Sequence, residues 1–340
     1  MAAIVHDFRS DTVTRPDEAM RRAMAEARVG DDVYGEDETV AALEAKVAEL
    51  TGKETGLFMA SGTQSNLVAL MSHCERGEEY IAGQDAHCYR FEAGGAAVLG
   101  SIQPQPIENA PDGSLPLEKI EAAIKVEDIH FARTRLFALE NTIGGKVLPQ
   151  TYVEDATALA RRHGLATHLD GARIFNAAVA SNRSAFDLAA GFDTVSVCLS
   201  KGLGAPVGSV LVGDKTFIEK ARRLRKMVGG GMRQAGIIAA AGIYALDHNI
   251  ARLADDHARA RRLAEGFARY DGLEVAMPQT NIFFLQADPA IAGRFADHMA
   301  AAGVGVSGRY GQQRWVTHKD VGDDAIDAAL DAAARFFAAA

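Results

Sequence analysis

The chain has 340 residues, of which 48% are hydrophobic and 24% charged, and this balance excludes a disordered protein and allows two domains with sizeable cores. Its net charge of -9, without a basic patch, argues against nucleic acid as a partner. The chain has neither a secretory signal nor an apolar run of the roughly 20 residues that a membrane span needs, and its three cysteines are too scattered for a disulfide framework or a zinc site. We therefore expect a cytoplasmic protein with no metal and no membrane partner.

The first two thirds of the chain alternate between predicted helices and predicted strands. Residues 16–24 read as a helix with Pro16 at its first position, and a second helix ends near Gly52. Short apolar runs follow, separated by helical stretches such as 152–163; they predict strands at 56–60, 135–139, 165–169, 194–199 and 208–212. Strands that are apolar on both faces and alternate with helices indicate an α/β fold with a mostly parallel sheet covered on both sides.

The pattern changes near residue 247. A long charged helix at 251–270 precedes two predicted strands at 281–285 and 313–317, which are separated by a helix at 291–302. A last helix carries apolar residues on one face. We therefore predict a large domain over residues 1–247, which includes the N-terminal segment, and a smaller C-terminal α/β domain over 248–340.

The segment 60–71 is the first with chemical character. A strand ends there, a turn of small residues follows, and a helix begins. Gly62 allows close approach of a ligand to the backbone, the helix N-terminus attracts anions, and Thr63 adds a hydroxyl, so the turn is a candidate phosphate site. The alternative is an ordinary helix cap provided by Ser61, Thr63 or Ser65.

Asp170 ends the predicted strand at 165–169 and precedes Gly171 and Ala172. Ligands of open α/β sheets collect at the carboxyl ends of the strands, where an aspartate can keep a pyridinium nitrogen protonated and make a pyridoxal ring an electron sink. Asp170 could instead cap the next helix. Arg173 would lie on the same side of this turn.

Lys201 lies in a turn of small residues between two apolar runs, where an ammonium group is costly to bury. Such an amine is typical of a lysine that forms a Schiff base with an aldehyde cofactor, although a structural lysine is the simpler alternative. One chain thus contains a candidate phosphate turn, a candidate ring-nitrogen partner and a candidate imine lysine. Unrelated structural roles explain any one of these much more easily than all three together.

Other polar residues have less specific signals. Arg314 precedes an apolar stretch and suits a substrate carboxylate, although an exposed edge arginine would have the same sequence. His87 and His130 lie beside predicted strands and could contact a ligand or be structural. Lys226 and Arg233 flank the glycines at 229–231 and could balance a phosphate or be solvated. A G-x-G-x-x-G motif after the first strand is absent, which disfavours a dinucleotide cofactor.

The chain resembles the low-specificity L-threonine aldolases among the pyridoxal-phosphate enzymes of the aspartate-aminotransferase-like fold, fold type I. The resemblance runs nearly end to end and rests on segments 8–15, 30–35, 61–66, 168–173, 199–204, 229–233 and 314–318. It implies pyridoxal 5'-phosphate as cofactor and a retro-aldol lyase that splits threonine, allo-threonine and related β-hydroxy amino acids into glycine and an aldehyde.

The resemblance also implies roles for individual residues. The cofactor would be bound by Lys201 through its amine, by Gly62 and Thr63 at the phosphate, by Asp170 at the ring nitrogen, and by Arg173 and His87 around the ring. Ser10 and Arg314 would bind the substrate carboxylate, His87 and His130 would bind its hydroxyl, and Phe91 would line the pocket. The base would be either His87 or a water held by both histidines. Lys226 and Arg233 would come from a neighbouring subunit of a homotetramer.

One segment departs from the family pattern as we know it, because Ile143-Gly144 stands where a His-Asn pair is frequent. This change could alter substrate range or diastereomer preference without affecting the cofactor residues. A β-eliminating pyridoxal lyase would share the fold and Lys201, and a cofactor-free binding protein is a more distant alternative.

Overall fold

The structure is a computed structural model that describes residues 3–309 and 311–338. A seven-stranded sheet forms its larger part, in the order β2 (Thr55–Met59), β8 (Ser209–Gly213), β7 (Thr194–Cys198), β6 (Ala166–Asp170), β5 (Thr134–Glu140), β3 (Glu79–Gly83) and β4 (Gln103–Ile107). Only β8 runs antiparallel to its neighbours, so the predicted, mostly parallel sheet is confirmed.

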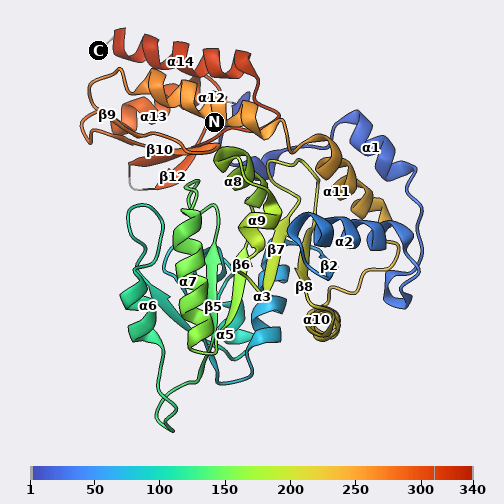
Figure 1. Ribbon diagram of the computed structural model, residues 1–340. Coiled ribbons are helices and arrows are strands. Elements are labelled where there is room, and N and C mark those ends of the chain that lie inside the picture. Colours follow the sequence, from blue (N-terminus) through green and yellow to red (C-terminus); the bar gives the residue numbers. More distant parts are fainter. Residues whose placement is uncertain (1–2, 310, 339–340) are drawn as a thin grey trace.

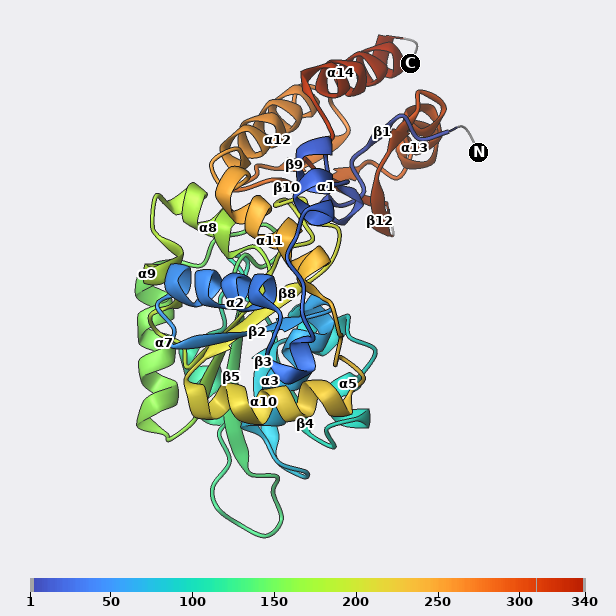
Figure 2. The same cartoon turned by 90° about the vertical axis from the view of Figure 1, so that its right-hand side faces the viewer.

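Helices cover both faces of this sheet (Figures 1 and 2). One face carries α3 (Gly62–His73) and α10 (Lys215–Met227), beside the short α4 (His87–Arg90) and α5 (Gly95–Val98). The other face carries α2 (Glu38–Thr51), α6 (Leu117–Ala123), α7 (Gln150–Arg162), α8 (Ile174–Ser181) and α9 (Ala185–Ala189). Helix α2 also packs on α11 (Gly236–His248), and α11 contacts α1 (Glu18–Ala25).

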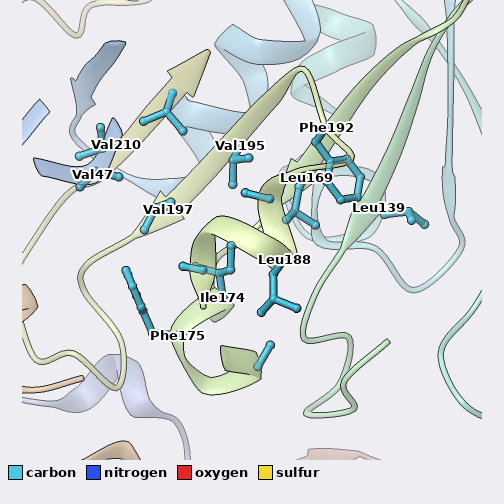
Figure 3. Packing of buried hydrophobic residues seen from close by; sticks show 14 of the residues in the cluster. Val47, Leu139, Leu169, Ile174, Phe175, Leu188, Phe192, Val195, Val197 and Val210 are labelled. Atoms are coloured by element: carbon cyan, nitrogen blue, oxygen red, sulfur yellow. The ribbon is translucent and has the colours of Figure 1, made fainter. Parts of the chain in front are cut away.

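The core explains why the strands read as continuous apolar runs. Leu169 and Val195 of the sheet pack against Ile174 of α8 and Leu188 of α9, as Figure 3 shows. Side chains of the intervening strand positions form separate clusters under α3. The central strands therefore bury both of their faces, which is the arrangement that the sequence pattern predicted.

A second, four-stranded antiparallel sheet belongs to the C-terminal part, in the order β12 (Ser307–Arg309), β13 (Gln312–Val316), β10 (Ile282–Ala287) and β9 (Leu273–Ala276). Its helices are α12 (Leu253–Phe267), α13 (Ala292–Ala301) and α14 (Asp323–Ala338). The predicted boundary at residues 247/248 falls at the last residue of α11, just before the connection to α12, and stays a prediction.

The N-terminal segment packs with this C-terminal part. Strand β1 (His6–Asp7) pairs with β11 (Val304–Gly305), and the ring of Phe8 lies 5.3 Å from that of Trp315 in the core between the helices and the small sheet. The segment then crosses to the large sheet through two 3-10 turns, Asp11–Val13 and Asp32–Tyr34. It therefore links the two sheets next to the predicted site.

Two local predictions need correction. The first helix begins at Glu18, not at Pro16, because the carboxylate of Asp17 accepts the N–H of Met20 and caps it. Strands β3 and β4 were not predicted, and β4 contains Pro104 and Pro106, which normally argue against a strand. Pairing explains the prolines: the N–H of Gln103 points to Glu78 on the β3 side, so the proline nitrogens point to the unpaired edge.

Candidate active site

The carboxyl ends of the parallel strands bring together the three cofactor motifs. Asp170 is the last residue of β6, Lys201 lies in the loop between β7 and β8, and Gly62 and Thr63 open α3 directly after β2. The amine of Lys201 is close enough to Asp11, Glu140 and His87 to interact electrostatically with all three. The sheet therefore assembles these motifs along one edge, where ligands of open α/β sheets bind.

The start of α3 has the properties of a phosphate cradle. Ser61 caps the helix by accepting the N–H of Gln64, which confirms the capping prediction for Ser61. In the described ranges no protein group accepts the N–H of Gly62 or of Thr63, so both donors are free for an anion. Beside them lies Ser209, whose buried hydroxyl has no hydrogen-bond partner in the described residues and is 3.6 Å from where a Cβ on Gly62 would be. An unpaired buried hydroxyl at this point fits a phosphate oxygen.

Asp170 lies between two other polar residues on neighbouring strands. The register pairs it with Glu140 of β5 and Ser196 of β7. Its Oδ1 accepts the N–H of Ala172 and its Oδ2 accepts from Nδ2 of Asn66 at 2.7 Å. Burial, followed by the charge of Asp170, raises the pKa of Glu140 to about 7. This edge of the sheet therefore concentrates negative charge where a protonated ring nitrogen would be stabilised.

Asn66 connects Asp170 to a second carboxylate and to a histidine. Its Nδ2 also donates to Oε1 of Glu92 at 2.8 Å, and its Oδ1 lies 3.2 Å from Nε2 of His168. Residues 168 and 170 point to the same face of β6, the face that α3 covers, and this explains why a helix residue reaches both.

The network continues away from the site through neutral histidines. Nδ1 of His168 and Nε2 of His73 lie 2.9 and 2.8 Å from the hydroxyl of Thr194. Burial lowers the pKa of His168 to about 4 and that of His73 to about 3. Both rings are therefore neutral at physiological pH and serve to hold the polar groups beneath the sheet edge.

His87 is the first residue of α4, and its imidazole is partly exposed. Oε2 of Glu140 accepts its backbone N–H at 2.7 Å, and its Nδ1 lies 2.8 Å from Oε1 of Glu92. The bond to Glu92 raises the pKa of His87 above its ordinary value. The ring of Phe91 is 5.8 Å away and largely exposed. His87 is thus brought to the predicted site, with one ring nitrogen held by a buried carboxylate.

An ion pair links the N-terminal segment to the sheet. Nε and Nη2 of Arg173 donate to the two oxygens of Asp11 at 2.8 and 2.6 Å, and Asn281 donates to Asp11 from the C-terminal part. Although burial alone would raise it, the pKa of Asp11 is held well below its ordinary value by the charge of Arg173. Within the described part of the chain, Nη1 of Arg173 donates no hydrogen bond and is free for a ligand.

Arg314 reaches the same place from β13. This strand lies between β12 and β10, so the alternative of an edge arginine is wrong. Nη1 of Arg314 donates to the carbonyl of Arg9 at 3.3 Å, next to Ser10, whose hydroxyl accepts from Thr12. Burial, and then the charge of Arg173, lowers the pKa of Arg314 to about 10. Two guanidinium groups that interact with the one carboxylate of Asp11 leave a net positive charge that suits a substrate carboxylate.

Among the predicted site residues, His130 is not brought to this edge within one chain. His130 is 77% exposed, pairs with Asp128, and lies before the first residue of β5, whereas the site lies at the last. A seven-residue strand separates the two ends by about 23 Å. Lys226 is in the last turn of α10, and Arg233 pairs with Asp31 at 2.9 Å.

The Ile143-Gly144 segment lies in the turn after β5. Ile143 is buried and pairs with Lys146, while Gly144 takes a φ of 56°. The carbonyl of Gly145 accepts the hydroxyl of Thr280 at 2.7 Å. The segment therefore contacts the C-terminal part beside the site, and its effect on substrate range stays a prediction.

One group of possible metal ligands occurs among the described residues, namely His87, Glu92 and Asp170, whose donor atoms lie within 4.8 Å of one another. The contacts given above already account for these atoms: Asn66 bonds both carboxylates, and Glu92 bonds the imidazole. A hydrogen-bond network therefore explains the cluster.

Known proteins match this chain over most of its length. The pattern of the beta-eliminating lyase family matches residues 7–290. The low specificity L-threonine aldolase of Escherichia coli K12 is 56% identical over 93% of this chain and 94% of its own length, and a probable low-specificity L-threonine aldolase of Arabidopsis thaliana is 50% identical over 82% and 81%. The chain belongs to the threonine aldolase family. The resemblance found in the sequence is thereby confirmed, as is dependence on pyridoxal phosphate, which this family of lyases shares.

Solved structures show the same fold. A Leishmania major threonine aldolase has a TM-score of 0.84 at 22% identity, covering 97% of this chain and 99% of its own. A Sphingomonas wittichii serine palmitoyltransferase has a TM-score of 0.72 at 21% identity, covering 97% and 84%. The predicted fold type I architecture is confirmed. No helix in the described ranges is long and apolar enough to cross a membrane.

The sequence analysis did not identify several residues of this site. Asp11 and Asn66 lie inside segments that carried the resemblance, and Glu92 and Glu140 lie close to residues that were selected, yet none was given a role. A usable signal existed for Asn66: it is seven residues before His73, so both lie on one face of α3, as His168 and Asp170 do on β6.

Proposed function

We propose that this family member cleaves L-threonine, L-allo-threonine and related β-hydroxy-α-amino acids into glycine and an aldehyde, which is acetaldehyde for threonine. The observation that carries the proposal is the convergence of Lys201, Asp170 and the free N-terminus of α3 at one sheet edge. Facing it are two arginines suited to a small molecule with one carboxylate.

The residues fit pyridoxal phosphate, which supplies an electron sink for the pair left on Cα when the Cα–Cβ bond breaks. We infer that Lys201 binds it through the amine, that Gly62, Thr63 and Ser209 bind its phosphate, and that Asp170 stabilises a proton on its ring nitrogen. Arg173 would donate to the ring hydroxyl or to the substrate through Nη1.

For the substrate, we infer that Arg314 and Ser10 bind the carboxylate and that Phe91 lines the pocket. An anchored carboxylate limits rotation about the bond from nitrogen to Cα, which favours cleavage of Cα–Cβ over loss of the Cα proton. His87 would accept the hydroxyl proton, because one imidazole nitrogen is held by Glu92 and the other is available.

We also propose a homotetramer with sites at subunit interfaces. The loop between α6 and β5 extends away from the body of the chain at the bottom of Figures 1 and 2. Val126, Ile129 and Phe131 expose 72%, 98% and 52% of their surface on this loop, which is unusual for free apolar side chains. We infer that the loop packs on another copy and delivers His130 to that copy's site, and that Lys226 and Arg233 act across an interface in the same way. A cytoplasmic location stays a prediction.

Product analysis tests the reaction. Purified enzyme given L-threonine should release acetaldehyde and glycine in equal amounts. Formation of 2-oxobutyrate and ammonia from threonine, or of pyruvate and ammonia from serine, would instead favour β-elimination, the reaction for which the matching family is named.

Subunit mixing tests the shared site. Lys201→Ala and His130→Ala proteins should each be impaired alone. If His130 serves a neighbouring site, hybrids reassembled from both contain sites with Lys201 from one chain and His130 from the other, and activity should reappear. Hybrids no more active than their parents, or a monomer by light scattering, would contradict the shared site.

A further inference from the structure

Glu92 is a buried carboxylate directly behind His87. Only 4% of its side chain is exposed, against 39% for the imidazole. Oε1 of Glu92 lies 2.8 Å both from Nδ1 of His87 and from Nδ2 of Asn66. Burying a carboxylate is costly unless hydrogen bonds compensate it, and none of the roles inferred above places Glu92 itself in contact with cofactor or substrate.

The polarity of these bonds follows from the chemistry of the groups. Carboxylates only accept hydrogen bonds, so the amide of Asn66 must direct its NH₂ at Glu92 and Asp170 and its oxygen at His168. For the same reason Glu92 must accept a hydrogen bond from the N–H at Nδ1 of His87. When His87 is neutral, its other nitrogen, Nε2, is therefore the unprotonated one.

The charged groups around His87 come from four elements. Glu92 follows α4 itself, Asp170 ends β6, Glu140 ends β5 and bonds the His87 backbone, and Lys201 lies in the loop after β7. The bond from Glu92 is the main cause that raises the pKa of His87, with Asp170 adding to it and burial and Lys201 opposing it. The hydrogen bond to Glu92 thus favours a proton on the ring more than any other neighbouring group does.

We propose that Glu92, itself held by Asn66, is a positioning residue that fixes the Nδ1–H tautomer of His87 and so presents Nε2 to the substrate hydroxyl. The inference rests on the proposed function, in which His87 accepts that proton. The O–H bond breaks toward Nε2, the oxygen forms a carbonyl with Cβ, and the Cα–Cβ pair remains on Cα until a proton from the imidazolium or solvent completes glycine. Glu92 stabilises the imidazolium in between.

A chemical readout independent of turnover tests the tautomer and charge. Diethyl pyrocarbonate acylates unprotonated imidazole, so the pH dependence of His87 labelling, followed by peptide mass spectrometry, gives the pKa of this one ring. In the wild-type enzyme, loaded and after cofactor removal, the midpoint should exceed the ordinary value of about 6.5. In Glu92→Gln, which retains an acceptor but loses the charge, it should fall by about one pH unit.

Kinetics supply the second readout. Glu92→Gln should lower kcat/KM for threonine on the order of 10- to 100-fold, mainly through kcat, and should move the acid limb of its pH profile to lower pH. Glu92→Asp, which keeps the charge at shorter reach, should recover part of the loss. Glu118→Gln, an exposed glutamate in α6, is the matched control and should change neither readout.

The outcomes separate this inference from the function on which it rests. An unchanged His87 midpoint in Glu92→Gln, or an unchanged acid limb, would overturn the role of Glu92 even if the enzyme cleaves threonine normally. A wild-type enzyme that releases no acetaldehyde would overturn the function, while the labelling profile would still report the pair. If Glu92→Gln does not fold, a wild-type midpoint at or below about 6.5 suffices to reject the inference.

Discussion

The two sides of the site are built in different ways. The side at the edge of the large sheet is acidic: Asn66 bonds Asp170 and Glu92, and Glu140 lies beside Asp170. The opposite side is basic: Arg173 pairs with Asp11, and Arg314 is close enough to interact electrostatically with both. The first side suits a protonated ring and amine, and the second suits a substrate carboxylate.

The difference extends to how each side is held. The acidic side depends on neighbouring strands of one sheet and on α3, which contacts them. The basic side joins the N-terminal segment, the turn after β6 and the C-terminal part through a single ion pair, between Asp11 and Arg173, and its amide partner Asn281. The acidic side should therefore tolerate the loss of one contact better than the basic side does.

Replacing Lys201 by alanine should have the largest effect, because it removes the amine that is placed to link to the cofactor. Turnover should fall by about 1000-fold or more. After borohydride treatment, intact mass should show bound cofactor in the wild type and in the control Lys215→Ala, but not in this variant. Retained turnover together with a retained covalent adduct would remove Lys201 from its role.

Asp11→Asn should show how far the basic side depends on one ion pair. Leaving Arg173 buried without its partner should cost about 3 to 5 kcal/mol of stability and lower the thermal midpoint. The exposed Asp297→Asn is the control. An equal midpoint for both variants would mean that the pair does not hold the two sheets together.

The same pair has a pH signature. The pKa of Asp11 in the folded protein is below that of the unfolded chain, so its contribution is complete above about pH 3.9 and is lost as pH falls toward the lower folded value. Wild-type stability should decline over this acid range more steeply than that of Asp11→Asn, as measured by thermal unfolding at a series of pH values.

Arg314→Lys should separate binding from chemistry on the basic side. A lysine keeps the charge but loses the planar pair of donors, so KM for threonine should rise on the order of 10-fold or more, with a smaller change in kcat. The exposed Arg269→Lys serves as control. If KM were unchanged, Arg314 would not bind the substrate carboxylate.

Ser209→Ala should give the smallest and most specific effect. The loss of one hydrogen bond to a charged phosphate should weaken cofactor affinity about 10-fold, measured by titration of the apoprotein. The apoprotein itself should be as stable as the wild type or slightly more so, since an unpaired buried hydroxyl disappears. Ser72→Ala, which removes a buried hydroxyl already bonded to Val68, should lower stability without changing affinity.

The acidic side could largely be anticipated from the sequence because each of its motifs follows a recognisable strand. Asp170, Lys201 and Gly62 all lie in the first residues after or at the end of an apolar run. Hydrogen-bond partners were harder to predict. The pairing of Asn66 with Glu92 depends on how the chain leaves the short helix α4, and the sequence does not specify this direction. The ion pair of Asp11 with Arg173 spans 162 positions and depends on where the N-terminal segment crosses between the sheets.

The prolines of β4 have a consequence for how copies of this chain can associate. Pro104 and Pro106 direct nitrogens without hydrogen to the open border of the large sheet. A second molecule laid along this border would find two missing donors, and a continuous intermolecular sheet or fibril could not start there. Contacts between subunits at this border must therefore be made by side chains and not by backbone pairing. Side chains can select one partner, whereas backbone pairing would accept any exposed strand.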